Sequence, residues 1–212
     1  MSWLVDAVRE VVDLGGPVVA VLAVVSVLTA AVILYKLWQF RAAGVGRHRA
    51  LARAVADWDA GARAQALREV ADGSSYLQPV FSMAMAQAGA EGLRARLEAE
   101  TETRFARLER GFRYLDSVAQ LAPLLGLFGT VLGMIEAFQS LQSAGAQVDP
   151  SLLAGGIWVA LLTTAVGLGV AMPTSVVLSW LESRMAAERV TAERGLAVIL
   201  TPVGAEKVRN AA

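Results

Sequence analysis

Four side chains that can handle ions lie inside two long, almost wholly apolar segments. They are Thr130 and Glu136 in the segment 121–138, and Thr163 and Thr164 in the segment 155–173. Hydroxyls and carboxylates are costly to place in lipid, so a polar group in a membrane helix marks an ion or proton route more often than it does in water. We therefore treat these four residues as a candidate ion pathway.

The same two segments are rich in small residues at helical spacing. Their members are Gly126, Gly129 and Gly133 in the first segment, and Gly156 and Gly167 in the second. Small residues in an apolar helix let two backbones approach closely, so these glycines predict helix packing. Pro173, late in the second segment, is expected to kink or loosen its helix, as membrane helices tolerate.

A structural explanation of the threonines is open beside the functional one. A membrane threonine commonly bonds back to the carbonyl four residues earlier, which is Gly126 for Thr130 and Ala160 for Thr164. Glu136 lies near the end of its segment, where snorkelling to the interface and a role at the ion entrance are both possible. From the residues alone, the hydroxyls are then ordinary contacts between helices.

Composition favours a membrane protein over a soluble one. The 212 residues are 56% hydrophobic, with a mean hydropathy of +0.52. Three stretches, 14–35, 117–135 and 150–181, carry no charge and are long enough to span a bilayer. The chain has no cysteine, no excess of basic residues that would indicate nucleic acid, and one histidine, His48, expected to be exposed. We find no catalytic set, so no enzyme or cofactor is predicted.

The distribution of basic residues predicts an orientation. Arg9 alone precedes the first span, Lys36 to Arg53 follow it closely, and no Lys or Arg lies in 142–151. The positive-inside rule then places the N-terminus outside and the C-terminus inside. The predicted segments are a periplasmic N-terminus (1–13), three transmembrane helices (14–40, 117–141, 152–181), a cytoplasmic helical segment (41–116), a periplasmic loop (142–151) and a cytoplasmic C-terminal helix or tail (182–212).

The cytoplasmic segment is expected to be helical with short breaks. Turn residues at 59–61 and 73–75 separate helices, and Pro79 fits a first helical turn. We expect one continuous helix from Gly92 to Leu141, since leucine and phenylalanine recur at helical spacing. The apolar stretch 195–203 is too short to span, so it lies at the interface or packs on the cytoplasmic helices.

The two glycine-threonine segments resemble the MotA/TolQ/ExbB ion-channel family, and its ExbB/TolQ branch in particular. The resemblance is carried by Gly126-Leu127-Phe128-Gly129-Thr130 with Gly133, and by Gly156-Ile157, Thr164-Ala165 and Gly167-Leu168 with Pro173. The order of elements also matches the branch. The implied fold is an all-α membrane protein with three transmembrane helices and long cytoplasmic helical extensions, assembled as a homopentameric ring.

The resemblance also implies a function. Such proteins surround a dimer of a single-span partner of the ExbD/TolR type, and ions crossing the bacterial inner membrane drive mechanical work on the envelope through a TonB- or TolA-like protein. By motif match, Thr130 and Thr164 line the ion path. No cofactor is implied; the translocated ion is the proton, with sodium as the alternative.

One position departs from the family pattern. Many ExbB- and TolQ-like proteins carry a glutamate five residues before the motif threonine of the third span, where this chain has Val159. Hydroxyls and carbonyls can ligate a hard cation such as sodium, which keeps a sodium-driven motor open. A non-conducting membrane scaffold for a partner is the other alternative, and a small-solute transporter is disfavoured because paired repeats with broken helices are absent from the sequence.

Overall fold

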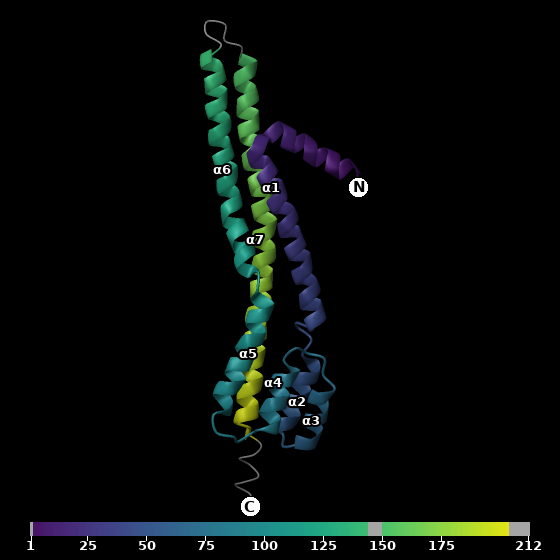
Figure 1. The fold of residues 1–212 in the computed structure, drawn as a ribbon. Helices are drawn as coiled ribbons and strands as arrows, with labels where there is room; N and C mark the ends of the chain where they lie inside the picture. Colours follow the sequence, from purple (N-terminus) through teal and green to yellow (C-terminus); the bar gives the residue numbers. More distant parts are fainter. Residues whose placement is uncertain (1, 144–149, 204–212) are drawn as a thin grey trace, which may run out of the picture. The chain divides into compact units, whose positions relative to one another are not determined.

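The computed structural model describes residues 2–143 and 150–203, which form seven helices and no strand (Figure 1). The helices are α1 (Ser2–Ala43), α2 (Arg49–Asp59), α3 (Arg63–Ala71), α4 (Gln78–Ala86), α5 (Leu93–Glu109), α6 (Phe112–Ser143) and α7 (Pro150–Leu200). Three of them are long and apolar enough to cross a membrane, over Gly16–Ala43, Phe112–Ser143 and Leu153–Leu200. The prediction of an all-α chain with three membrane-crossing helices is confirmed for the described residues. Most of the predicted loop 142–151 lies outside them.

The chain divides into two compact units. Within the described residues, the first unit comprises 2–34, 111–143 and 150–179, and the second comprises 35–110 and 180–203. α1 and α7 each contribute to both units. At 1.5 Å per residue, the 51 residues of α7 extend about 77 Å, more than twice the ~30 Å hydrocarbon core of a bilayer.

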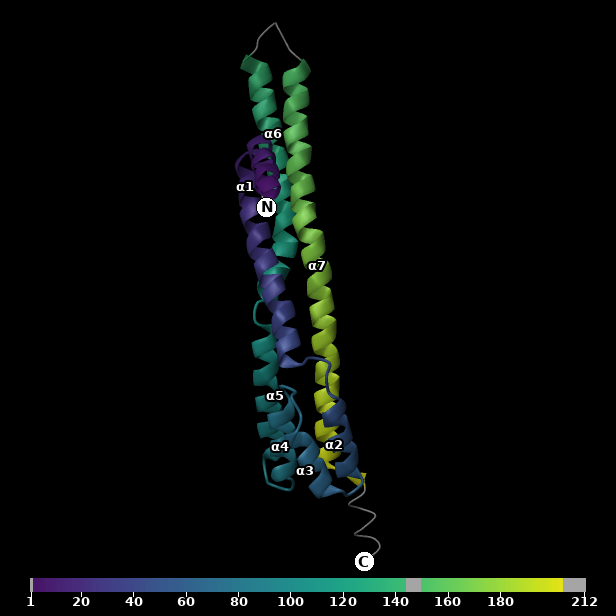
Figure 2. The same ribbon diagram turned by 90° about the vertical axis from the view of Figure 1, so that its right-hand side faces the viewer.

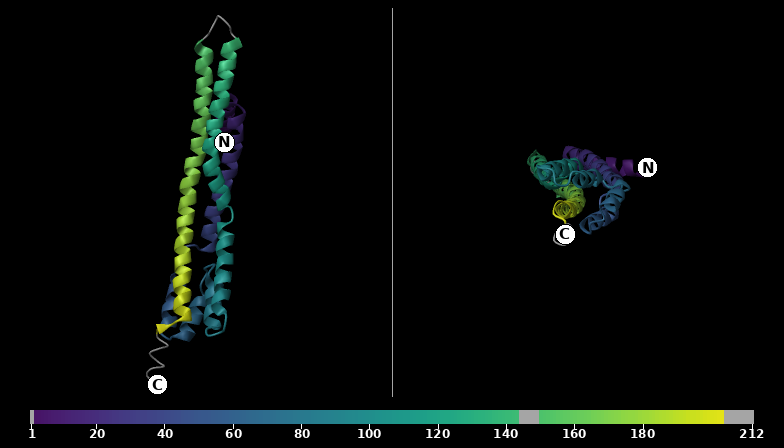
Figure 3. Two further views of the ribbon diagram at one scale, coloured as in Figure 1. Left: turned by 90° about the vertical axis from the view of Figure 1, so that its left-hand side faces the viewer. Right: turned by 90° about the horizontal axis from the view of Figure 1, so that it is seen from below.

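The first unit is an antiparallel pair of helices, α6 and α7, with α1 packed beside it (Figure 1; left view of Figure 3). Leu22 of α1 is fully buried in a cluster with Val118, Ala122 and Ala171. The hydroxyls of Thr29 and Tyr114 lie 3.3 Å apart and join α1 to α6. α1 is interrupted at Gly16, whose φ is 69°, because the proline that follows it disfavours the α conformation there.

The second unit packs α2 to α5 against the last turns of α7 (Figure 2). The indole Nε1 of Trp58 donates to the carbonyl of Ile199 at 3.1 Å. A Cβ on Gly195 would lie 2.5 Å from Phe81 Cε1, so α7 approaches α4 as closely as a glycine allows. The stretch from Gly195 therefore packs against the helices of 41–116. The predicted breaks at 59–61 and 73–75, and Pro79 in a first turn, are confirmed.

The expected continuous helix from Gly92 to Leu141 is wrong. α5 ends at Glu109 and α6 begins at Phe112. Between them Arg110 is extended, with ψ 122°, and Gly111 has φ 98°, a left-handed conformation that glycine adopts without steric cost. A glycine just beyond the last turn is a common helix stop, so Gly111 ends α5.

Lys36 donates a hydrogen bond to a backbone carbonyl in the last turn of α5. Its side chain is 2% exposed, and Nζ donates to the Leu108 carbonyl at 3.0 Å and to Gln39 Oε1 at 2.8 Å. The last carbonyls of a helix have no partner within it, and a cation there also meets the negative end of the helix dipole. Lys36 thus fixes α5 onto the final turns of α1.

Candidate ion pathway

Two facing stripes of small residues hold α6 and α7 together. The α6 stripe consists of Gly126, Gly129, Gly133 and Ala137; the α7 stripe consists of Gly156, Ala160, Thr163 and Gly167. A Cβ on Gly167 would lie 2.6 Å from the Ala122 carbonyl oxygen, and one on Gly126 would lie 2.9 Å from the Thr163 carbonyl oxygen. Both distances are shorter than van der Waals contact with backbone, so any larger residue would force the helices apart.

The other predicted packing residues differ in how tightly they are held. A Cβ on Gly129 would lie 2.7 Å from Thr163 Cβ, and one on Gly156 would overlap Ala137. At Gly133 the nearest atom would be 3.4 Å away, an ordinary contact. Pro173 lies outside both stripes: α7 continues through it, and its side chain is exposed.

The three threonines make different hydrogen bonds. Thr163 is buried in the α7 stripe and donates to Ala160 O at 2.7 Å and to Gly126 O across the interface at 3.2 Å. Thr164 also reaches Gly126 O, at 3.4 Å. The expected bond from Thr164 to Ala160 is therefore wrong. The small residues of the α6 stripe bring the carbonyl of Gly126 within hydrogen-bonding distance of Thr164. Thr130 bonds to Leu127 O at 2.6 Å, three rather than four residues back.

Helical periodicity places Thr130 and Thr164 on one side of the α6/α7 pair. With about 100° between successive residues, Thr130 lies about 55° beyond the α6 stripe and Thr164 about 70° beyond the α7 stripe, in the same rotational sense. Because the two helices are antiparallel (Figure 3), equal senses of rotation point to the same side of the pair. Both side chains are half-buried in the described chain.

α1 covers the opposite side of the pair. Its residues Val18, Leu22 and Val25 pack in the cluster that includes Val118 and Leu125 of α6 and Val166 and Val170 of α7. By the same rotation, the partly or fully buried residues Val118, Leu125, Val166 and Val170 lie on the side of the stripes away from the threonines, whereas Ala171 of the same cluster lies about 50° toward the threonine side of the α7 stripe. Neither Thr130 nor Thr164 belongs to this cluster, and most of its α6 and α7 members lie on the opposite side, so α1 leaves the side of these two threonines open.

Glu136 is not brought together with these threonines. It is exposed, and it lies about 9 Å further along α6 than Thr130 and about 120° around the helix from it. Val159, the position of the departure from the family pattern, lies on the α1 side of α7 by the same reasoning. The open side thus offers two hydroxyl groups in an apolar wall and no carboxylate from these two positions.

A buried polar network in the second unit escaped the sequence prediction. His48 was expected to be exposed, but its side chain is 10% exposed, and Nε2 lies 2.7 Å from Glu188 Oε2. The same carboxylate, which is 4% exposed, accepts from Tyr76 Oη at 2.7 Å and from the Gly46 amide at 2.8 Å. Nδ1 of His48 lies 3.1 Å from Ser75 Oγ. The partners are up to 142 residues apart in sequence, so no local sequence pattern predicts their contact.

The protonation state of Tyr76 follows from this environment. Burial and the hydrogen bond to Glu188 both raise the pKa of Tyr76 above its ordinary value. The phenol therefore stays protonated and donates to the carboxylate. Glu188 bonds to three residues, Gly46 and His48 in the loop after α1 and Tyr76 in the segment before α4, and so holds both segments to α7.

We expect Glu188→Gln to loosen this tie. Glutamine keeps the shape of the side chain, but its amide NH2 group faces hydrogen-bond donors that bind the carboxylate in the parent protein. Leaving such a buried donor without an acceptor costs about 1–3 kcal/mol. Hydrogen exchange measured by mass spectrometry should show faster exchange in the segment that contains the Gly46 amide. Glu193→Gln, an exposed position on the same helix, is the matched control and should leave exchange unchanged. Equal exchange in both variants would show that Glu188 does not hold the loop.

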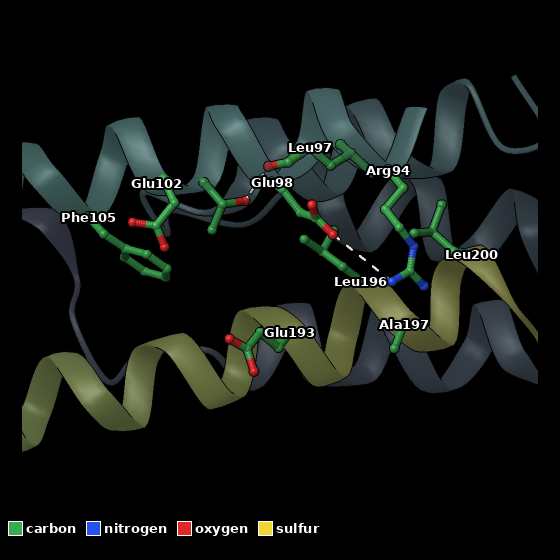
Figure 4. Close-up of a pocket in the computed structure, with 10 residues that line it drawn as sticks. Arg94, Leu97, Glu98, Glu102, Phe105, Glu193, Leu196, Ala197 and Leu200 are labelled. Carbon is green, nitrogen blue, oxygen red and sulfur yellow. Dashed lines mark hydrogen bonds and ion pairs between the residues drawn. The ribbon is translucent and has the colours of Figure 1, made fainter. Parts of the chain in front are cut away.

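A hollow of about 410 Å³ lies between α5 and α7 (Figure 4). Leu97 and Phe105 form part of its wall, and both are 1% exposed. Two of the carboxylates that line it are paired: Glu98 with Arg94 at 4.0 Å and Glu102 with Arg189. We attribute this hollow to the packing of long side chains between two helices.

Known proteins resemble parts of this chain. A curated relative from Synechocystis, "Putative biopolymer transport protein ExbB-like 1", is 38% identical over 111 residues, which are 51% of this chain and 42% of the relative. "Biopolymer transport protein exbB1" of Vibrio cholerae is 46% identical over 63 residues, 30% of this chain and 28% of the relative. "Tol-Pal system protein TolQ" of Haemophilus influenzae is 40% identical over 78 residues, 37% and 34% respectively.

In each of these cases the match spans less than half of the relative's length. The model of the MotA/TolQ/ExbB proton channel family matches residues 68–194, a range that contains α4 to α6 and most of α7 with both glycine stripes. With three membrane-crossing helices in the described residues, the chain is a multi-pass membrane protein. It belongs to the MotA/TolQ/ExbB proton channel family, in the ExbB/TolQ branch.

Proposed function

We propose that this chain is the ion-channel subunit of an inner-membrane motor that couples the proton motive force to mechanical work on the cell envelope. It would act with a dimer of an ExbD/TolR-like single-span protein. The work would reach the envelope through a TonB- or TolA-like protein, in TonB-dependent import or in a Tol-Pal type system. The N-terminus would be periplasmic and the C-terminus cytoplasmic.

The observation that carries this proposal is the common side of Thr130 and Thr164. These hydroxyls lie on the side of the α6/α7 pair that α1 leaves open, by the rotation described above. A ring of copies, five by analogy with the branch, would turn that side toward its axis and keep α1 on the outside. The hydroxyls would then line a passage between the ring and the partner helices.

The proposal divides the chemistry between two proteins. Neither Glu136 nor Val159 shares the side of the threonines, so the titrating group would be an aspartate of the partner helix. The hydroxyl oxygens of Thr130 and Thr164 keep free lone pairs after donating to Leu127 O and Gly126 O. They can therefore accept hydrogen bonds from hydrated protons or ligate a cation.

The energy released by ion flow is sufficient to drive such a motor. Moving one charge through 100 mV releases about 2.3 kcal/mol, so a few ions per step can drive a conformational change. We expect proteoliposomes that hold the chain with its single-span partner to take up protons when a membrane potential is imposed, as reported by an internal pH dye. Liposomes that hold the chain alone are the control and should stay near the background rate.

Two other outcomes of this experiment would replace the proposal. Uptake that stops when sodium is exchanged for potassium would identify the sodium-driven version of the motor. A complex that forms with the partner but conducts neither ion would indicate a non-conducting scaffold.

A further inference from the structure

A basic pocket lies within the second unit, where the final turns of α1 approach α7. It has a volume of about 360 Å³. Its lining combines three arginines with apolar side chains, namely Arg41, Arg47, Arg184, Trp180, Leu37 and Phe40. The residues come from the end of α1, the loop after it and α7. A cavity lined by both cationic and apolar side chains suits an amphipathic anion.

The three arginines are available to a ligand. None of the ion pairs formed within the described part of the chain includes Arg41, Arg47 or Arg184. The guanidinium carbon of Arg184 lies 5.9 Å from the centre of the Trp180 ring, and its Nη2 would lie 3.7 Å from a Cβ on Gly46. Glu188, which binds the same loop at the Gly46 amide, is already engaged by His48 and Tyr76.

The pocket lies at the ends of two membrane-crossing segments. Arg41 lies in the last turn of α1, whose apolar part runs from Gly16 to Ala43. On α7 the charge-free stretch ends at Leu181, three residues before Arg184. Trp180 is 48% exposed, and tryptophan at the end of a span favours the depth of the lipid head groups. Because the lining residues lie at the ends of two membrane-crossing segments, we expect the pocket at the level of the lipid phosphates.

We propose that this pocket binds an anionic phospholipid of the adjoining leaflet. The phosphate would lie among the three guanidinium groups, which match phosphate geometry with several donors each. An acyl chain would continue along Leu37 and Phe40 toward the bilayer. The apolar lining residues and the position at the span ends favour this ligand over a free phosphate, which would contact the arginines alone.

The test uses the full-length chain purified in a neutral detergent and native mass spectrometry. Retention of phosphatidylglycerol is compared with that of phosphatidylcholine with identical acyl chains. Each cation near an anionic lipid surface contributes about fivefold to binding, so the combined variant Arg41→Gln, Arg47→Gln and Arg184→Gln should lose about a hundredfold in preference for phosphatidylglycerol. The matched control, Arg68→Gln, Arg96→Gln and Arg107→Gln, removes three exposed arginines of the same unit and should bind as the parent does.

The outcomes are separable. An unchanged preference for phosphatidylglycerol in the first triple variant would overturn the proposal. Displacement of the lipid by millimolar inorganic phosphate would also overturn it and indicate a soluble anion. If the triple variant does not fold, Arg47→Gln replaces it, because Arg47 is exposed in the loop after α1, and the expected loss is then about fivefold.

Discussion

Replacing both Thr130 and Thr164 with valine is expected to reduce proton uptake by more than tenfold while leaving the protein assembled with its partner. Valine has nearly the shape of threonine but no hydroxyl, so the packing of α6 on α7 is kept and two polar groups are lost. A proton or cation passing between apolar helices needs such groups, since unsatisfied charge in lipid is costly. The measurement is the proteoliposome assay, with the partner retained during purification as the check of assembly.

The control for this prediction is Thr174→Val. Thr174 is a buried threonine of the same helix, and its hydroxyl donates within α7 to Val170 O at 2.7 Å. It should conduct as the parent does. Thr163→Val is informative in another way, because Thr163 is 1% exposed and bonds to Gly126 O: we expect lower stability with conduction retained. Full uptake by the Thr130/Thr164 double variant would make those threonines structural residues.

Membrane-crossing segments and their small-residue spacing are local properties, and this explains why the sequence predicted them well. Each apolar run must satisfy its own backbone as a helix in lipid, whatever its neighbours do. The close approach of Gly126 to Thr163 follows from the same spacing, because a helix repeats every 3.6 residues and presents its glycines on one face.

Features that depend on a single residue or on distant partners were missed. Gly111 ends α5 through one left-handed conformation, which outweighs the apolar periodicity on either side of it. His48 is buried because Glu188, 140 residues away, hydrogen-bonds to its ring and the ring of Tyr76 packs beside it. Thr164 bonds to α6 because the facing glycine leaves its carbonyl uncovered. Contacts between residues that are far apart in the chain cannot be predicted from a local sequence pattern.

Gly167→Leu is expected to have the largest effect on stability. A Cβ at this position would lie 2.6 Å from the Ala122 carbonyl oxygen and 3.1 Å from Gly126 Cα. Both are backbone atoms, which cannot rotate away as a side chain can, so the helices must separate. Overpacking of this kind costs about 3 kcal/mol, which corresponds to a fall in the thermal midpoint of about 10 °C for a chain of this size.

Gly169→Leu provides the matched comparison for this substitution. Gly169 lies two residues further along α7, and no atom lies within 4 Å of a Cβ built on it. Both variants replace a helical glycine by the same leucine, which itself favours the helix by up to 1 kcal/mol, so any difference between them measures the contact with α6. Thermal unfolding of the purified chains, followed by circular dichroism in one detergent, should show the fall for Gly167→Leu alone. Equal midpoints would mean that the close approach of α6 and α7 does not stabilise the fold. The placement of Thr130 and Thr164 on one side of the pair, which depends on that contact, would then be wrong.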